Sequence, residues 1–170
     1  MQTYTSKATS INKEKLPAVY RKAAISAPVV FDYGCGKYTD HIREYLDTQC
    51  GAVLLPYDPF NQPREVNQKS RKLLTNCIMH DIPVDIICSN VLNVIDNDTS
   101  INTIAWNIQN IVNKTGGIGY ITVYEGNRSG IGKQTGPDQY QRNEPLRSYL
   151  KYFSNAIIKN GMIIVSSKTC

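Results

Sequence analysis

Two short apolar runs near the start of the chain each end in an aspartate and each lead into a helical segment. The first run ends in Asp32 and a turn with two glycines, and the second ends in Asp58 before a proline. A helical spacing of apolar residues follows the first run, and a polar helical segment follows the second. This alternation favours a parallel sheet, whose ligands bind at the carboxyl ends of its strands.

The alternation continues along the rest of the chain. It predicts strands at 28–32, 52–58, 84–88, 118–124 and 162–165. It predicts helices at 17–24, 39–49 and 64–74, a helix that runs from a cap at Asp98, Thr99 or Ser100 to Gly116, and a helix at 145–153. Between the last two helices, residues 126–143 form a long polar loop with four glycines and no hydrophobic period. We therefore expect an α/β, Rossmann-like fold with three layers, in which a doubly wound, mostly parallel sheet carries helices on both faces.

Length and composition exclude several classes of protein. A chain of 170 residues fits one domain. It contains no apolar run near the ~20 residues of a membrane span, and its polar start lacks the apolar stretch of a signal peptide, so we expect a cytoplasmic protein without membrane association. An odd number of cysteines without a Cys-x-x-Cys pair argues for reduced thiols and against a metal site: Cys35, Cys50, Cys77, Cys88 and Cys170.

The net charge of +5 is concentrated at the two ends of the chain. Residues 1–22 carry five basic and one acidic residue, residues 23–127 seven and eleven, and residues 128–170 seven and two. Basic end segments, including an N-terminal segment at 1–27 with a short helix, suit a polyanionic partner such as DNA or another nucleic acid. A solvated basic surface explains the same distribution.

The turn at 32–37 is the sharpest candidate for a binding site. Gly34 and Gly36 let the backbone turn tightly and approach a ligand closely. Asp58 ends the next strand, 26 residues after Asp32, where an acid can accept both ribose hydroxyls of an adenosine. The two acids would then flank one pocket for a nucleotide-like ligand. A plain strand-to-helix turn and an ordinary turn acid are the alternatives.

These residues resemble the first motif of class I S-adenosylmethionine-dependent methyltransferases, which is hydrophobic-Asp-x-Gly-x-Gly followed by an acid at the end of the second strand. Asp32, Gly34, Gly36 and Asp58 match it position by position, while the usual third glycine is absent. NAD enzymes are a poorer match, because their Gly-x-Gly-x-x-Gly has glycines where this turn has aspartate and lysine. The resemblance implies S-adenosylmethionine as cofactor, held by these four residues together with Cys35, Pro59, Asp81, Ile82 and Asn90.

A narrower resemblance covers most of the chain. It is to a bacterial group described as DNA phosphorothioation-associated methyltransferases and to short phage-type relatives, at residues 6–10, 32–37, 57–59, 90–96 and 132–141. It implies cofactor binding and a link to DNA, without a proven reaction. One strand after the last helix leaves the usual terminal antiparallel hairpin incomplete, so we expect a fold shortened at its C-terminal end. With no separate target-recognition domain, specificity would come from the 126–143 loop, the basic ends or a protein partner.

The residues that would handle a methyl acceptor carry a weaker signal. The segment after the 84–88 strand lacks the (Asp/Asn/Ser)-Pro-Pro-(Tyr/Phe) motif of amino methyltransferases, and no cysteine follows a proline as in the cytosine-C5 enzymes. Direct in-line transfer is then expected, and positioning lowers much of its barrier. Candidate catalytic residues are Asn90, Glu125 and Tyr140, and candidate substrate-binding residues are Asn93, Gln134 and Gln141.

Three functions remain open on the sequence. The first is a methyltransferase that acts on DNA or a nucleic-acid-like substrate. The second is an S-adenosylmethionine-binding module without transfer, which regulates a partner or sequesters or degrades the donor, and the absent acceptor motif supports it. The third is a nucleic-acid-binding protein that merely retains the fold, with salt-dependent DNA binding and no affinity for the donor.

Overall fold

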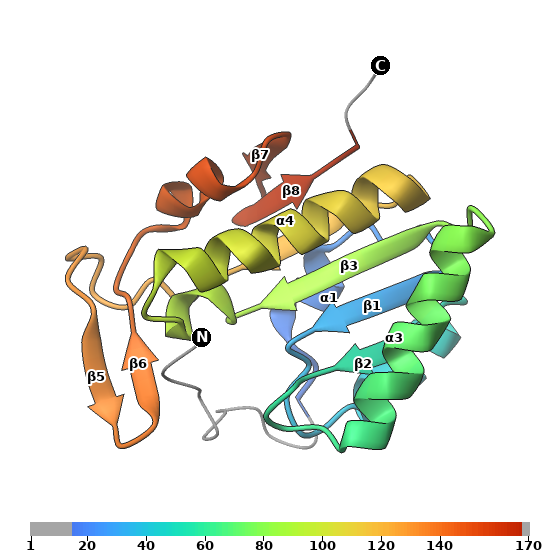
Figure 1. The fold of residues 1–170 in the computed structure, drawn as a ribbon, viewed down its shortest axis with the longest axis horizontal. Coiled ribbons are helices and arrows are strands. Elements are labelled where there is room, and N and C mark those ends of the chain that lie inside the picture. Colours follow the sequence, from blue (N-terminus) through green and yellow to red (C-terminus); the bar gives the residue numbers. More distant parts are fainter. Residues whose placement is uncertain (1–14, 168–170) are drawn as a thin grey trace.

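The computed structural model describes residues 15–167, which form a six-stranded sheet between two layers of helices (Figure 1). The strands of this sheet are β1 (Val29–Tyr33), β2 (Val53–Tyr57), β3 (Val84–Ser89), β4 (Gly119–Thr122), β7 (Ala156–Lys159) and β8 (Met162–Val165). The helices are α1 (Ala18–Lys22), α2 (Asp40–Tyr45), α3 (Arg64–Met79) and α4 (Asp98–Thr115). A π-helical turn, η1 (Leu46–Cys50), continues α2, and two 3-10 helices are η2 (Leu92–Val94) and η3 (Leu146–Tyr152).

The strand order is β2-β1-β3-β4-β8-β7. The first four strands are parallel, whereas β8 runs antiparallel to β4 and β7 antiparallel to β8. The chain builds the sheet outward from β1 to β2 and then, on the other side of β1, from β3 onward, so the order reverses between β1 and β3. The predicted α/β class and mostly parallel sheet are confirmed, and the arrangement is compatible with a Rossmann-like fold.

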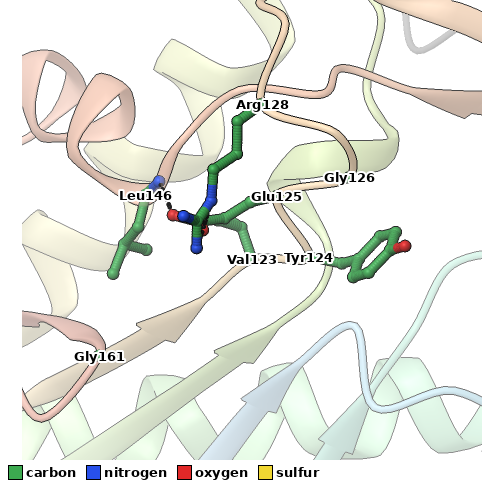
Figure 2. Close-up of a pocket in the computed structure, with 7 residues that line it drawn as sticks. All are labelled: Val123, Tyr124, Glu125, Gly126, Arg128, Leu146 and Gly161. Atoms are coloured by element: carbon green, nitrogen blue, oxygen red, sulfur yellow. Dashed lines mark hydrogen bonds and ion pairs between the residues drawn. The ribbon is translucent and has the colours of Figure 1, made fainter.

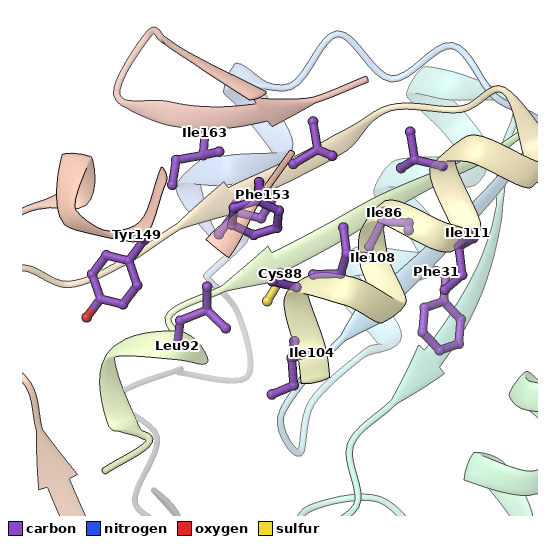
Figure 3. Packing of buried hydrophobic residues seen from close by; sticks show 14 of the residues in the cluster. Phe31, Ile86, Cys88, Leu92, Ile104, Ile108, Ile111, Tyr149, Phe153 and Ile163 are labelled. Carbon is purple, nitrogen blue, oxygen red and sulfur yellow. The ribbon is translucent and has the colours of Figure 1, made fainter. Parts of the chain in front are cut away.

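Two hydrophobic clusters hold the layers together. Helices α3 and α4 cover one face of the sheet, and α1 and α2 pack against the other (Figure 1). Isoleucines of α4 pack with Phe31 of β1 and Ile86 of β3 (Figure 3). On the opposite face, Tyr20 and Ile42 pack with Val30 of β1. Both faces of the central strands are therefore buried, as expected for parallel strands with near-continuous apolar runs.

Helix α4 has identifiable signals at both ends. The Asn97 side chain accepts a hydrogen bond from the Ser100 N–H at 2.8 Å, which caps the helix one residue before the expected caps. Gly116 ends the helix in a left-handed conformation, with φ at +71°. The amphipathic pattern between them therefore forms the predicted helix, which begins at Asp98 and ends at Thr115.

Three expectations about element boundaries are corrected. Two strands, β7 and β8, follow η3, so the terminal antiparallel hairpin is complete and the expected shortening at the C-terminal end is wrong. Residues 77–79 continue α3, because Cys77 shares the buried face of Leu74 one helical turn earlier. The long loop at 126–143 contains a hairpin of its own, β5 (Lys133–Gly136) and β6 (Gln139–Gln141).

Part of the basic N-terminal segment lies outside the described residues. Residues 1–14, with the stretch at 6–10 that carries one of the resemblances, belong to this part. The short helix expected within 1–27 is confirmed as α1. Across 15–167, no helix combines the length and the apolar character needed to cross a bilayer.

Candidate functional site

The carboxyl ends of the parallel strands lie along one edge of the sheet. β1 and β3 are neighbours there, and the chain leaves them toward opposite ends of the sheet, with β2 on one side and β4 on the other (Figure 1). Such a reversal is the position at which open α/β sheets bind ligands. We call the carboxyl ends of β1 and β3 the switch point.

Residues 34–37, which follow β1 and are called the glycine turn below, lie between the ends of β2 and β3. Gly34 has φ at +90° and Gly36 at +72°, a region that favours glycine. The Gly34 N–H donates to the Tyr57 carbonyl of β2 at 2.7 Å. On the other side, a Cβ added to Gly34 would lie 2.3 Å from Cγ2 of Val91, which follows β3. The motif glycine at this position is therefore required by both the backbone angle and the close packing.

Replacing Gly34 with alanine is expected to lower the free energy of unfolding by roughly 2–4 kcal/mol, since it combines a left-handed penalty with overpacking. Gly51→Ala is the matched control, because Gly51 has φ at +63° and no atom within 4 Å of an added Cβ; its cost should be about 1 kcal/mol. Urea unfolding measures both. Val91→Ala should recover part of the loss in the Gly34→Ala background, and equal costs for the two glycines would contradict this packing.

Asp58 joins the loop after β2 to the glycine turn. Its Oδ1 accepts from the N–H groups of Phe60 and Asn61, both at 2.9 Å. Its Oδ2 accepts from the Gly36 N–H at 3.0 Å and from Nδ2 of Asn61 at 3.1 Å. Asp58 is only 6% exposed, so its four acceptor positions are filled inside the protein. The predicted proximity of Asp58 to the glycine turn thus takes the form of a hydrogen bond to Gly36, and Pro59 follows at the surface.

Asp32 is buried beneath the same turn. It is 3% exposed and accepts a hydrogen bond from the Tyr20 hydroxyl of α1 at 2.5 Å. Burial raises the pKa of Asp32 to about 7, the Tyr20 hydrogen bond opposes this, and the charge of Asp58 adds to it. The carboxyl group therefore changes protonation close to neutral pH. The sequence offered no sign that Tyr20, twelve residues earlier, would be its partner.

Two cysteines line this region without forming reactive thiolates. Cys35 of the glycine turn and Cys88 of β3 are both buried, and burial raises the pKa of each thiol well above its ordinary value. The described cysteines are free thiols, as expected. Among residues 15–167, no group of three or more His, Cys, Asp and Glu side chains is placed to hold a metal ion.

The two asparagines that follow β3 are separated by the structure. Asn90 is exposed at the switch point with φ at +57°, and its N–H donates to the Thr122 carbonyl of β4 at 2.9 Å. Asn93 is 2% exposed, and its Nδ2 donates to Oε1 of Gln141 at 3.1 Å. Gln141 in turn donates to the Tyr124 carbonyl at 2.8 Å. Asn90 can meet a ligand, whereas Asn93 and Gln141 fix η2 and β6 to the end of β4.

The other two candidates from the long loop belong to the β5–β6 hairpin. Gln134 is exposed on β5, and its Nε2 donates to the Pro137 carbonyl at 3.0 Å within the hairpin. Tyr140 on β6 is half-buried, and its hydroxyl lies so close to Gly132 that a Cβ there would be 1.8 Å away. Tyr140 thus packs against the loop that enters the hairpin.

Glu125 lies in a separate cleft beyond β4, with a volume of about 550 Å³ (Figure 2). Its Oε1 accepts from the Leu146 N–H at 2.6 Å, and its Oε2 accepts from Nε of Arg128 at 2.6 Å. The Leu146 hydrogen bond first, and Arg128 in addition, lower the pKa of Glu125. Glu125 is therefore an ionised anchor for η3 and a weakened base. The cleft is lined by residues 123–126, Arg128, Leu146 and Gly161.

Asp81 and Ile82 lie at the opposite edge of the sheet, so the expectation that they line the same pocket is corrected. They precede β3, whose first residue, Val84, pairs with Val29, the first residue of the parallel strand β1. The residues before Val84 therefore lie at the amino ends of these strands. The reason is that they lie between the end of α3 and the start of β3, where the chain enters the sheet at the amino ends of its parallel strands.

Three exposed aromatic side chains lie at the carboxyl edge and were not predicted as site residues from the sequence. Tyr38 follows the glycine turn, Phe60 follows Asp58 by two residues, and Tyr124 follows β4; they are 36%, 45% and 64% exposed. The Tyr124 ring points away from the Glu125 side chain (Figure 2). Their positions directly after strand ends were the available signal, because such residues stand at the ligand edge of an α/β sheet.

Comparisons of the chain with protein-family models, with curated proteins and with solved structures find no match. A function for the switch point is therefore argued from its own residues. These are the glycine turn, the Asp58 loop, the Tyr20–Asp32 pair and the exposed Asn90.

Proposed function

We propose that this protein binds S-adenosylmethionine at the switch point and transfers its methyl group to DNA or another nucleic-acid-like substrate. The observation that carries the proposal is the hydrogen bond between Gly36 and Asp58, which joins the glycine turn after β1 to the acidic loop after β2 at the ligand edge of the sheet. An acid can accept hydrogen bonds from the ribose hydroxyls of a nucleoside ligand, and a tight glycine turn lets the backbone approach the same ligand closely.

The residues present fit an adenosyl ligand with one rearrangement. Asp58 already accepts four hydrogen bonds, of which only the one from Nδ2 of Asn61 comes from a side chain. A ribose hydroxyl can take the place of this amide without breaking a backbone contact. Phe60 and Tyr38 carry exposed aromatic rings at this edge, of the kind that can stack on a purine. Asp81 and Ile82 take no part.

When bound, S-adenosylmethionine would supply a methyl group from its sulfonium sulfur to a lone pair of the acceptor, and S-adenosylhomocysteine would leave with the electrons of the broken carbon–sulfur bond. The chain's contribution is then to position the acceptor and exclude competing geometries. We assign the acceptor side to Asn90, which is exposed at the switch point, and to Tyr124. Covalent catalysis by Cys35 or Cys88 is disfavoured because burial keeps both thiols protonated.

The second candidate function is donor binding without transfer. It is favoured because residues predicted to handle the acceptor make hydrogen bonds within the protein instead. Asn93 and Gln141 hydrogen bond to each other, and Glu125 is engaged by Leu146 and Arg128. A protein of this kind would bind the donor and its demethylated product but leave acceptors unmodified.

The test is methyl incorporation from S-adenosylmethionine labelled in its methyl group, with duplex DNA, single-stranded DNA and RNA in separate reactions. We expect label in at least one of them, and a loss of roughly tenfold or more in Asn90→Gly, which keeps the left-handed backbone and removes the amide. Asn160→Gly is the matched control, because Asn160 is also exposed, with φ at +53°, in the β7–β8 turn.

The outcomes separate the two candidates. Donor binding with no label in any acceptor contradicts the transferase and supports the binding module. Equal losses in Asn90→Gly and Asn160→Gly would contradict the role assigned to Asn90. If the protein neither binds the donor nor labels any acceptor, both candidates are contradicted, and the nucleic-acid-binding function is the one that remains.

A further inference from the structure

Strand β7 is an open edge of the six-stranded sheet. Within the described residues it pairs only with β8. Ile157 is 61% exposed and Ile158 is 42% exposed. An edge strand with exposed apolar side chains and unpaired backbone groups is a template for another strand.

The opposite edge of the sheet, β2, is protected in a way that β7 is not. The Val53 N–H and the Tyr57 carbonyl of β2 are directed toward the β1 side, where they bond to Pro28 and to the glycine turn. Backbone groups alternate along a strand, so Pro56 faces outward, and proline has no N–H to offer there. β7 contains no proline, and its one charged residue is Lys159 at its end.

The β7–β8 turn fixes which backbone groups of β7 face outward. The turn residues Asn160 and Gly161 have φ at +53° and +71°, as in a two-residue hairpin turn, and Lys159 pairs with Met162. The residues that flank such a turn exchange hydrogen bonds with each other, and the next residue to do so is Ile157. The N–H and carbonyl groups of Ala156 and Ile158 therefore point away from β8.

We propose that a second copy of this chain pairs antiparallel with β7 around a twofold axis at Ile157. Ala156 of each copy would exchange hydrogen bonds with Ile158 of the other, which satisfies the outward groups of both. Ile157 would face Ile157 of the second copy in a non-hydrogen-bonded pair, where side chains are closest. The two sheets would then continue into one another.

The strand is complementary to itself, which is why the occupant is a second copy. In this register Lys159 lies opposite Asn155 of the other chain, so the single charge of the strand never meets its own copy. The most exposed isoleucine meets its equivalent, and both isoleucines lose water contact. Because β7 has only four residues, the interface is small and we expect the dimer to be weak, so that it forms only at high protein concentration.

Disulfide trapping tests the register. Cα atoms of a non-hydrogen-bonded pair lie about 4.5 Å apart, which a disulfide can span, so Ile157→Cys should form a covalent dimer under mild oxidation. Ile158→Cys should trap far less, because it faces Ala156 rather than itself. Ile131→Cys is the exposure control, since Ile131 is 73% exposed and lies outside β7; the unsubstituted protein gives the background from its native cysteines.

Sedimentation over a range of concentrations tests the association itself. The unsubstituted protein should shift from monomer to dimer as concentration rises. Ile158→Pro places a proline on β7 at an outward-facing position, as Pro56 is placed on β2. Because the lost N–H points away from β8, the variant should fold normally, which circular dichroism checks. Its dimer should be roughly tenfold or more weaker. A monomer at every concentration, or trapping of Ile157→Cys no faster than Ile131→Cys, would overturn the proposal. Neither result depends on S-adenosylmethionine.

Discussion

Asp58→Ala is expected to lower the free energy of unfolding by roughly 3–5 kcal/mol, because it leaves buried donors from two loops without their shared acceptor. The donors are the backbone N–H groups of Gly36, Phe60 and Asn61 and the Asn61 side chain. Urea unfolding at neutral pH measures the loss. The same variant should also lose the stabilisation given by an adenosyl ligand.

Two further variants make this result interpretable. Asp138→Ala removes an exposed acid near the tip of the β5–β6 hairpin and should cost within about 0.5 kcal/mol. Asn61→Ala removes one donor and leaves the three backbone bonds to Asp58, so it should cost about 1 kcal/mol and leave one position of the carboxylate open to a ribose. If Asp58→Ala behaved like Asp138→Ala, the four-donor arrangement would be contradicted.

The second large effect is a pH dependence of stability that comes from Asp32. Its folded-state pKa of about 7 lies above the ordinary value of 3.8, so the folded protein binds the proton more tightly than the unfolded chain. The contribution of this proton to the free energy of unfolding is therefore complete below about pH 4 and is lost as the pH rises to about 7. A shift of this size corresponds to roughly 4 kcal/mol in the free energy of unfolding.

The measurement is urea unfolding from pH 4 to pH 8 for the unsubstituted protein and for Asp32→Asn, which does not titrate. The difference between their unfolding free energies should fall steadily across this range. Tyr20→Phe removes the hydrogen bond that holds the pKa down, so it should move the fall toward higher pH. A difference that stays constant with pH would contradict the buried, protonated state of Asp32.

Most of the fold was predictable because its signals are local. The period of apolar residues in α4 and the apolar runs of β1 to β4 arise from burial on one helix face or on both sheet faces. The β7 strand was missed although Asn160–Gly161 between apolar residues is a hairpin signal. The β5–β6 hairpin could not be found by period, because most of its side chains are polar and neither strand alternates between buried and exposed residues.

The site was predictable where it depends on backbone shape and less so where it depends on partners. The proximity of Asp58 to the turn at Gly34 and Gly36 follows from the order of strands and turns. Whether a polar side chain such as Asn93 faces a ligand or the interior depends on residues far away in the sequence, here Gln141. Asp81 was misplaced because it precedes β3, and residues that enter a parallel strand lie at the amino edge of the sheet rather than at its ligand edge.

The central claim is tested most directly by a thermal-shift titration of the unsubstituted protein with S-adenosylmethionine and S-adenosylhomocysteine, with NAD as the comparison ligand. At about 100 times its dissociation constant, a ligand that binds the folded state adds about 2.7 kcal/mol to the free energy of unfolding. We predict a saturable rise in the melting temperature with both adenosyl ligands and none with NAD. No rise with either adenosyl ligand would contradict the proposed site.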